Sequence, residues 1–275
     1  MTTVATGEDA VLAAVWRLDN AQQQCTPCAP VRDLLPAGDL AAAYAVQSKV
    51  IANRRAAGAQ IVGHKIGLTN PKVQAQLGVD QPDFGVLLSD MRCTGDDPID
   101  ITRLLQPRIE AELAFVLARD LDLPAVTEAD VADATAYVTA ALEIVDSRIT
   151  GWDISITDTV ADNASSGLFV LAEHQVPLSA VDMTRAEMTM RSGGQIVSSG
   201  TTAECLGSPL AAVAWLASTT RDFGVPLRAG DIVLSGALGP MVPVTPGSAF
   251  IAAVAGAGTV SASFTSPTDP ARTTT

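Results

Sequence analysis

Basic residues are scarce in this sequence, with 17 Lys and Arg against 30 Asp and Glu in 275 residues. The formal net charge is −13, and the basic residues are scattered along the chain. A surface that binds a nucleic-acid backbone needs clustered positive charge, so we expect no nucleic-acid partner. Charged residues of both signs make up only 17% of the chain, below the roughly 25% of an average soluble protein. Apolar residues replace them, which indicates extensive buried surface and favours a homo-oligomer.

Long apolar runs are also absent. No stretch approaches the roughly 18 apolar residues of a membrane-spanning helix, so we expect no membrane partner. The first ten residues, MTTVATGEDA, lack the basic region and apolar core of a secretory signal peptide. We therefore expect a cytoplasmic protein, and its 48% apolar content is enough for a large core.

Cysteine and histidine are too few for most metal and nucleophile chemistry. Cys25 and Cys28 form a C-x-x-C pair in a proline-interrupted segment, and the sequence holds no second pair. We expect free cysteines here, with a zinc site only if distant residues converge. His64 and His174 are the only histidines, so a nucleophile with a histidine base must use one of them. Carboxylates are the abundant reactive groups.

The spacing of apolar residues and of turn signals predicts an α+β protein. Helices are predicted over 8–24, 39–58, 70–78, 127–140 and 208–223. An extended segment is predicted over 59–69, and strands over 109–117, 142–147, 167–171, 187–191, 195–198, 231–235, 250–254 and 259–264. This order divides the chain into a helical N-terminal region over 1–100, a β-rich catalytic domain over 101–265 and a disordered tail over 266–275.

Two glutamates project from one face of the strand predicted over 109–117. Strand side chains alternate between faces, so Glu110 and Glu112 share one face while the apolar residues around them take the other. Neighbouring carboxylates on an apolar strand need a compensating cation, a raised pKa or exposure to solvent. Glu143 is likewise an isolated acid in an apolar strand. Together the three acids would suit Mg²⁺ or Mn²⁺, which prefer oxygen ligands, whereas plain exposure is the alternative that the spacing leaves open.

Four segments of the chain carry a resemblance to a known family: VGHKIGLTNPKVQAQLGVDQPDFGVLLSDM, QPRIEAELAFVLARDL, ALEIVDSRITGWDISITDTVADNASSG and LSGALGPMVPVTPG. Over about residues 8–264 the sequence resembles the 2-keto-4-pentenoate hydratase group of the fumarylacetoacetate hydrolase superfamily, which also contains the 2-oxo-3-hexenedioate decarboxylases. The resemblance implies a helical N-terminal part followed by the mixed β-sandwich roll of that superfamily. It also implies a homo-oligomer.

The resemblance further implies a set of site residues. They are Glu110, Glu112 and Glu143 as metal ligands, Lys65 and Asp83 as catalytic residues, and Ser165, Leu87 and Gly236 as substrate-binding residues. Without the resemblance, the residue types alone define these roles less specifically. The glycines that flank Lys65 allow close backbone approach and favour an anion-binding or acid–base role. Asp83 and Ser165 are equally typical of turns and helix caps.

The activity that the resemblance implies is addition of water to 2-hydroxypenta-2,4-dienoate, which gives 4-hydroxy-2-oxopentanoate, with Mg²⁺ or Mn²⁺ as cofactor and an aldolase as a pathway partner. Three alternatives stay open. Decarboxylation of 2-oxo-3-hexenedioate would use the same metal but needs room for a second carboxylate. Hydrolysis of an acylpyruvate needs a base-activated water, and the histidine that such hydrolases use has no evident match. A non-catalytic partner protein would keep only the fold.

Overall fold

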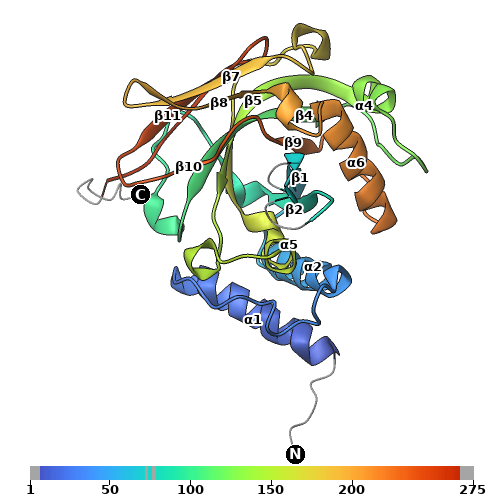
Figure 1. The fold of residues 1–275 in the computed structure, drawn as a ribbon, viewed down its shortest axis with the longest axis vertical. Coiled ribbons are helices and arrows are strands. Elements are labelled where there is room, and N and C mark those ends of the chain that lie inside the picture. The colour runs from blue at the N-terminus through green and yellow to red at the C-terminus, as the bar shows by residue number, and fades with distance from the viewer. Residues whose placement is uncertain (1–6, 72–73, 76–78, 267–275) are drawn as a thin grey trace, which may run out of the picture.

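The computed structural model describes residues 7–71, 74–75 and 79–266. Helices lie near the N-terminal end and also along one side of the strands, which form a large curled sheet with a smaller sheet beside it (Figure 1); this arrangement confirms the predicted α+β class. The α-helices of these residues are α1 (Gly7–Gln24), α2 (Leu40–Ala56), α4 (Glu128–Ala134), α5 (Ile156–Ala161) and α6 (Pro209–Asp222). The strands are β1 (Ile61–Gly67), β2 (Asp83–Leu88), β3 (Arg92–Cys93), β4 (Arg108–Leu117), β5 (Thr135–Val145), β6 (Ser166–Leu171), β7 (Glu187–Ser192), β8 (Gln195–Thr201), β9 (Ile232–Ala237), β10 (Val242–Pro243), β11 (Ala249–Val254) and β12 (Gly258–Ser263).

The large sheet has the strand order β2-β1-β9-β4-β5-β6-β3, and β10 pairs with β4 off this path. Its centre is the long antiparallel pair β4 and β5. Ile109, Leu113 and Phe115 alternate along β4 and are completely buried, so the face of β4 opposite the glutamates belongs to the core. This pairing fixes the register of the strands that carry the predicted metal ligands.

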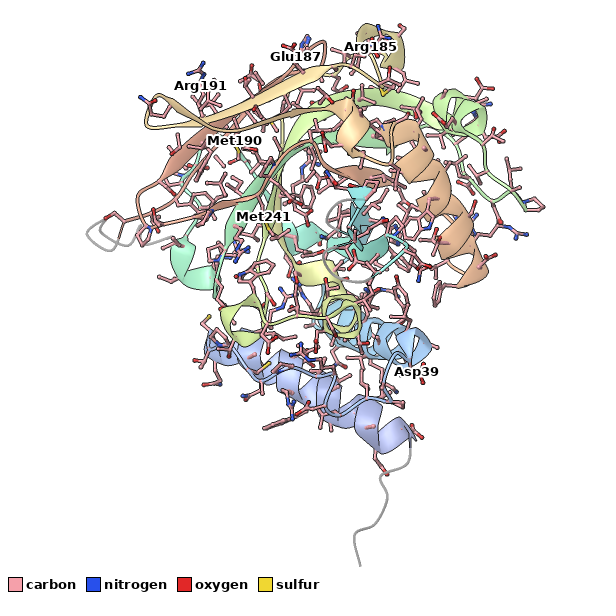
Figure 2. All side chains as sticks on the ribbon, in the orientation of Figure 1. Asp39, Arg185, Glu187, Met190, Arg191 and Met241 are labelled. Carbon is pink, nitrogen blue, oxygen red and sulfur yellow. The ribbon has the colours of Figure 1, made fainter. Side chains whose placement is uncertain are left out.

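The smaller sheet has the order β12-β11-β7-β8 and packs through β11 and β12 against β5 and β6. Alternation along β7 turns Met188 and Met190 into the core and leaves Glu187 and Arg191 exposed. Figure 2 shows Glu187 and Arg191 on the outer side of this sheet and Met190 on its inner side. The outer face of β7 is therefore far from the glutamates of β4.

The N-terminal helices pack on each other and then on the large sheet. α1 contacts α2, and α2 contacts α5, with a small apolar cluster of their own that includes Leu18 and Val46. The Asp39 side chain accepts a hydrogen bond from the Ala42 amide at 2.9 Å and caps α2, as its sequence predicts. On the other side of the molecule, α6 packs on β1 and β9.

The N-terminal region also supplies strands to the large sheet. β1 pairs in antiparallel fashion with β2 and in parallel fashion with β9, so the first hundred residues share a sheet with the rest of the chain. The division of the chain near residue 100 stays a prediction. The helix predicted over 70–78 lies largely outside the described residues, although residues 71, 74 and 75 are helical. The tail predicted over 266–275 lies outside them apart from Ser266.

The helix predicted over 127–140 is wrong in its second half. The capping box of Thr127 and Asp130 starts α4, but the helix ends at Ala134 and β5 begins at once. Thr135, Tyr137, Val138 and Thr139 are β-branched or aromatic, which favours a strand, and Val138 pairs with Phe115 across the sheet. Tertiary pairing therefore overrides the helical start.

Cys25 and Cys28 are free thiols, as predicted, and so are the other two cysteines. Cys28 donates a hydrogen bond from Sγ to the Arg148 carbonyl at 3.2 Å. Within the described part of the chain, no helix combines the length and the apolar character needed to cross a bilayer.

Candidate active site

The three predicted metal ligands lie together on adjacent strands. Glu110 of β4 lies directly opposite Glu143 of β5, and Glu112 follows on the same face of β4 because strand side chains alternate. One carboxylate oxygen from each of the three acids lies within 4.8 Å of the others. Glu112 and Glu143 are buried, while Glu110 keeps part of its surface exposed. The cluster is therefore open to solvent on the side of Glu110.

The acid cluster has more oxygens than hydrogen-bond donors. Glu112 accepts a hydrogen bond on Oε2 from the Gly236 amide at 2.7 Å. Among the described residues, its Oε1 and both oxygens of Glu143 are buried without a hydrogen-bond partner. The Lys65 ammonium lies 3.3 Å from Glu143 Oε1, and in the described part of the chain neither Glu110 nor Glu112 has an ion pair. Buried carboxylates in this state are costly, and a bound cation would satisfy them.

Burial and the neighbouring negative charges raise the pKa values of two of these acids. Burial, together with the negative charge of Glu143, raises the pKa of Glu110 to about 7. Burial and the charges of Glu143 and Glu110 raise the pKa of Glu112 well above its usual range. Protons therefore compete with a cation for these carboxylates.

Lys65 points from β1 toward the acids. Alternation places it on the face opposite His64 and Ile66, as the sequence predicts, and its side chain is only 3% exposed. Burial alone would lower the pKa of Lys65, but the negative charges of Glu143 and Asp83 outweigh it and raise the pKa. The ammonium form is therefore held by its neighbours.

Asp83 begins β2 and lies opposite Gly67 of β1. It is only 1% exposed, and its Oδ2 accepts a hydrogen bond from the Thr159 hydroxyl at 3.1 Å. Burial raises the pKa of Asp83, while the Lys65 charge and the Thr159 hydrogen bond act in the opposite direction. Asp83 is thus a buried acid beside a buried lysine, and the role of a simple surface turn does not apply.

Ser165 lies in a strained turn between α5 and β6. Asn163, Ala164 and Ser165 all have positive φ values of 51° to 55°, a region that costs roughly 1–2 kcal/mol for each non-glycine residue. The Asn163 side chain holds the turn to β2, because it donates to the Val86 carbonyl at 2.9 Å and accepts from the Val86 amide at 2.7 Å. The Ser165 hydroxyl is buried without a partner among the described residues. Strain of this kind concentrates at functional sites.

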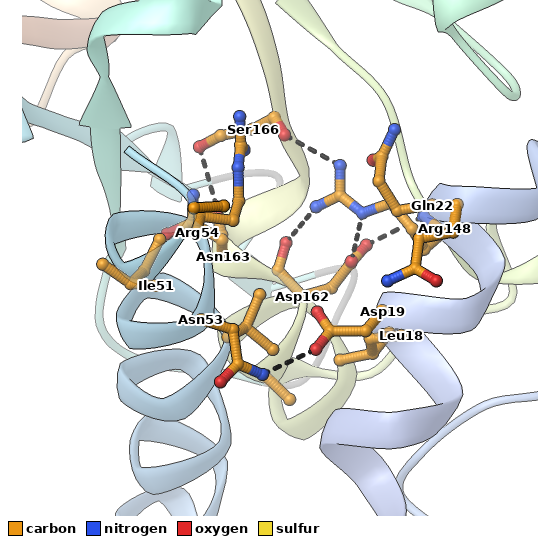
Figure 3. A pocket seen from close by; sticks show the side chains of 14 residues that line it. Leu18, Asp19, Gln22, Ile51, Asn53, Arg54, Arg148, Asp162, Asn163 and Ser166 are labelled. Atoms are coloured by element: carbon orange, nitrogen blue, oxygen red, sulfur yellow. Dashed lines mark hydrogen bonds and ion pairs between the residues drawn. The ribbon is translucent and has the colours of Figure 1, made fainter. Parts of the chain in front are cut away.

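A buried ion pair supports the same turn. Arg148 donates to Asp162 from Nε at 2.5 Å and to the Ser166 carbonyl from Nη1 at 2.8 Å, and Nη2 also donates to the Asp162 carbonyl. Figure 3 shows the guanidinium between Asp162 and Ser166, beside a cavity of about 210 Å³ that α1 and α2 also line. Burial raises the pKa of Asp162 to about 6, against the opposing effect of Arg148.

The two other predicted substrate residues lie in different settings. The Gly236 amide contacts Glu112, and its φ of +104° suits only glycine; a Cβ there would also lie 2.5 Å from the Thr69 hydroxyl. Leu87 is 1% exposed and belongs to the main hydrophobic core. Its alternation along β2 places it on the face of Asp83, and its contact with substrate stays a prediction.

A larger cavity of about 600 Å³ lies behind the site, on the opposite face of β1. His64, Phe84 and Tyr44 line it, and none of the acids of the cluster does. His64 faces this cavity and not the acids and is 6% exposed, so it is a packed histidine. Burial lowers the pKa of His64 to about 4, which keeps the imidazole neutral at pH 7.

Thr159, Asn163 and Arg148 position the site, but the sequence interpretation missed them. The capping box of Ser155 and Asp158 opens the buried segment that runs to Ser166. That local signal predicts a helix start, yet it says nothing about the contacts that Thr159 and Asn163 make with residues 76 and 77 positions earlier.

These observations define a class of protein. Three carboxylates converge on a point beside a buried lysine and a buried aspartate, and several of their oxygens have no donor. Such an oxygen-rich set fits a hard divalent cation such as Mg²⁺ or Mn²⁺. The centre thus has the composition of a divalent-metal site beside a buried lysine and aspartate, which is the arrangement that metal-assisted acid–base enzymes use.

Comparison with known proteins identifies the family. Residues 60–265 match the family model described as fumarylacetoacetate (FAA) hydrolase C-terminal, and the chain belongs to this family. It is 49% identical over 258 residues to a 2-keto-4-pentenoate hydratase of Burkholderia vietnamiensis, and the aligned region covers 94% of this chain and 98% of that relative. It is 42% identical over 251 residues to a 2-hydroxyhexa-2,4-dienoate hydratase of Comamonas testosteroni, with 90% and 95% covered.

A solved structure agrees in fold over the same length. The 4-oxalocrotonate decarboxylase of Pseudomonas putida G7, complexed with magnesium and adipate, superposes with a TM-score of 0.90 at 34% identity, covering 95% of this chain and 99% of that one. The fold implied by the sequence resemblance is thereby confirmed.

Proposed function

We propose that this protein adds water to 2-hydroxypenta-2,4-dienoate, also called 2-keto-4-pentenoate, to give 4-hydroxy-2-oxopentanoate. The observation that carries the proposal is the convergence of Glu110, Glu112 and Glu143 within 4.8 Å, with Lys65 3.3 Å from Glu143. The near full-length similarity to enzymes named as hydratases of such dienoates supports it. The protein is then a hydro-lyase.

The three glutamates are the proposed ligands of a divalent metal, Mg²⁺ or Mn²⁺. When bound, the metal supplies Lewis acidity and a chelation point for the carboxylate and the C2 oxygen of the substrate. The remaining chemistry belongs to side chains of the chain. Ser165, whose hydroxyl is buried and unpaired, and the segment that begins at Gly236 are the proposed walls of the substrate site.

Lys65 and Asp83 are the proposed proton-transfer residues. In the reaction the enol hydroxyl loses a proton, C5 gains one, the hydroxyl of water bonds to C4, and the remaining proton of water goes to C3. Lys65 is held as a cation, so it can stabilise negative charge at the C2 oxygen and exchange a proton there. Asp83 has one buried oxygen free to carry a proton. Well-placed acid–base groups contribute about 10²- to 10⁴-fold.

Hydration is tested by the loss of dienoate absorbance in ultraviolet light. We expect turnover with Mg²⁺ or Mn²⁺, loss of turnover on chelation, and recovery when the metal is returned. We also expect Lys65→Met to lose most of the activity while it still binds metal. Full turnover by metal-free protein would contradict the proposal.

Decarboxylation of 2-oxo-3-hexenedioate is the second candidate, because the decarboxylase structure superposes over nearly the whole chain. The curated hydratases are the more similar in sequence, so hydration ranks first. If the protein released carbon dioxide from 2-oxo-3-hexenedioate faster than it consumed the dienoate, decarboxylation would rank first. A homo-oligomeric state and a downstream aldolase are further parts of the proposal.

A further inference from the structure

The two oxygens of the Asp83 carboxylate have different surroundings. Oδ2 accepts the hydrogen bond from Thr159 at 3.1 Å. Oδ1 is buried and has no hydrogen-bond partner among the described residues. A hydrogen bond to one oxygen of a carboxylate restricts rotation of the group and distinguishes the two oxygens. The Asp83 carboxylate is therefore oriented: Oδ2 is held by a hydrogen bond, and Oδ1 is left to exchange a proton.

The free oxygen lies on the catalytic face of β1. A Cβ added to Gly67 would lie 2.2 Å from Asp83 Oδ1, so this oxygen occupies the space above Gly67. Residues two apart on a strand share a face, and Lys65 is two residues from Gly67. Oδ1 therefore lies on the same side of β1 as the Lys65 side chain.

The backbone around the Thr159 hydrogen bond is also fixed. Gln47 of α2, which is 3% exposed, donates from Nε2 to the Phe84 carbonyl at 2.9 Å and to the Val160 carbonyl at 3.0 Å. These carbonyls belong to the residues that follow Asp83 and Thr159. A single buried amide thus ties β2 to α5 at the point where the hydroxyl meets the carboxylate.

From this geometry we propose that Thr159 is a positioning residue, whose hydroxyl holds Asp83 Oδ2 so that Oδ1 faces Lys65 and the substrate. The inference rests on the proposed hydratase function and deepens it. Thr159 does not touch the acid cluster in any described contact, so its effect passes through Asp83. Its hydroxyl matters for the rate of proton transfer and much less for substrate affinity.

The test uses two pairs of variants in which only the hydroxyl differs. Thr159→Val is compared with the wild type, and Thr159→Ala with Thr159→Ser. For Thr159→Val we expect kcat to fall by about 10- to 100-fold, the range for displacement of an acid–base group, while KM changes less than about threefold. Thr159→Ser should keep kcat within about threefold of the wild type, and Thr159→Ala should repeat the loss. Thr220→Val is the matched control, because Thr220 is equally buried and its hydroxyl bonds within α6.

Thermal unfolding of each variant separates folding from catalysis. If Thr159→Val does not fold, the Ala and Ser pair still decides the question, because both lack the same methyl group. Equal kcat within either pair would overturn the inference, and so would a rise in KM at unchanged kcat. A wild-type protein without hydratase activity would overturn the proposed function and this inference together, whereas an active wild type with an equally active Thr159→Val would overturn this inference alone.

Discussion

Replacement of Glu112 by glutamine separates metal binding from folding. The amide has the shape of the carboxylate, and its oxygen can still accept the hydrogen bond that the Gly236 amide gives at 2.7 Å. Glu112 is completely buried, so a neutral side chain of equal size loses no packing. We therefore expect Glu112→Gln to fold and to lose most of its affinity for the divalent metal.

The expected change in stability on replacing Glu112 follows from the separation of the acids. Two ionised carboxylates with oxygens no more than 4.8 Å apart would repel by at least about 3.5 kcal/mol at an effective dielectric constant of about 20. The raised pKa of Glu112 reflects burial and this repulsion, and a neutral amide removes the repulsion as protonation of Glu112 does. In chelator the variant should thus unfold at the same temperature as the wild type or higher. A metal at about 100 times its Kd stabilises the wild type by about 2.7 kcal/mol, which corresponds to about 5–10 °C in Tm.

Thermal unfolding followed by circular dichroism measures both effects. The experiment is run at pH 8, because the pKa of Glu110 is about 7 and protons compete with the metal below it. Glu187→Gln is the control, since Glu187 lies exposed on the outer face of β7 (Figure 2) and should keep the full metal-induced rise in Tm. A rise in Glu112→Gln equal to that of the wild type would refute the reasoning.

Two further predictions concern stability. Burial lowers the pKa of His64 from 6.5 to about 4, so between these values the unfolded chain binds a proton that the folded protein does not, and this group alone removes up to about 3 kcal/mol of stability as the pH drops through the window. The raised pKa values of Glu110 and Asp162 act in the opposite direction in the wild type and in His64→Gln alike. Between pH 7 and pH 4.5, urea unfolding should therefore show the unfolding free energy of the wild type falling relative to that of His64→Gln, and an equal change in the two proteins would contradict the prediction. Arg148→Met should cost about 3–5 kcal/mol because it leaves Asp162 buried without its cation, whereas Arg54→Met, which breaks only an exposed pair, should cost less than about 1 kcal/mol.

The part of the site that follows strand periodicity could be predicted from the sequence. Glu110 and Glu112 share a face of β4 because they are two residues apart, and Lys65 faces away from His64 for the same reason. Burial of the flanking apolar residues also follows from this alternation. What periodicity does not give is the partner strand. Glu143 stands out in the sequence as an isolated acid in an apolar strand, but its position opposite Glu110 follows only from the pairing of β4 with β5.

The part that depends on contacts between distant residues could not be predicted. Thr159 forms a hydrogen bond with Asp83, which lies 76 positions earlier in the sequence, and no local pattern specifies that contact. The left-handed turn that contains Asn163 and Ser165 is similarly hidden, because neither residue signals positive φ strongly enough to stand out. The same reason explains the error at Thr135, where pairing with β4 decided between helix and strand.

The strand order explains how the two halves of the site are held at a fixed separation. β9 lies between β1 and β4, and Leu234 of β9 pairs with Lys65 on one side and Ala114 on the other. Neighbouring strands are about 4.8 Å apart, so three strand spacings separate the backbones of β1 and β5 by about 14 Å along the sheet. The Lys65 and Glu143 side chains together span this gap. Gly236, also on β9, holds Glu112. Because paired strands, and not loops, set these distances, the three acids and Lys65 keep their geometry before any ligand arrives.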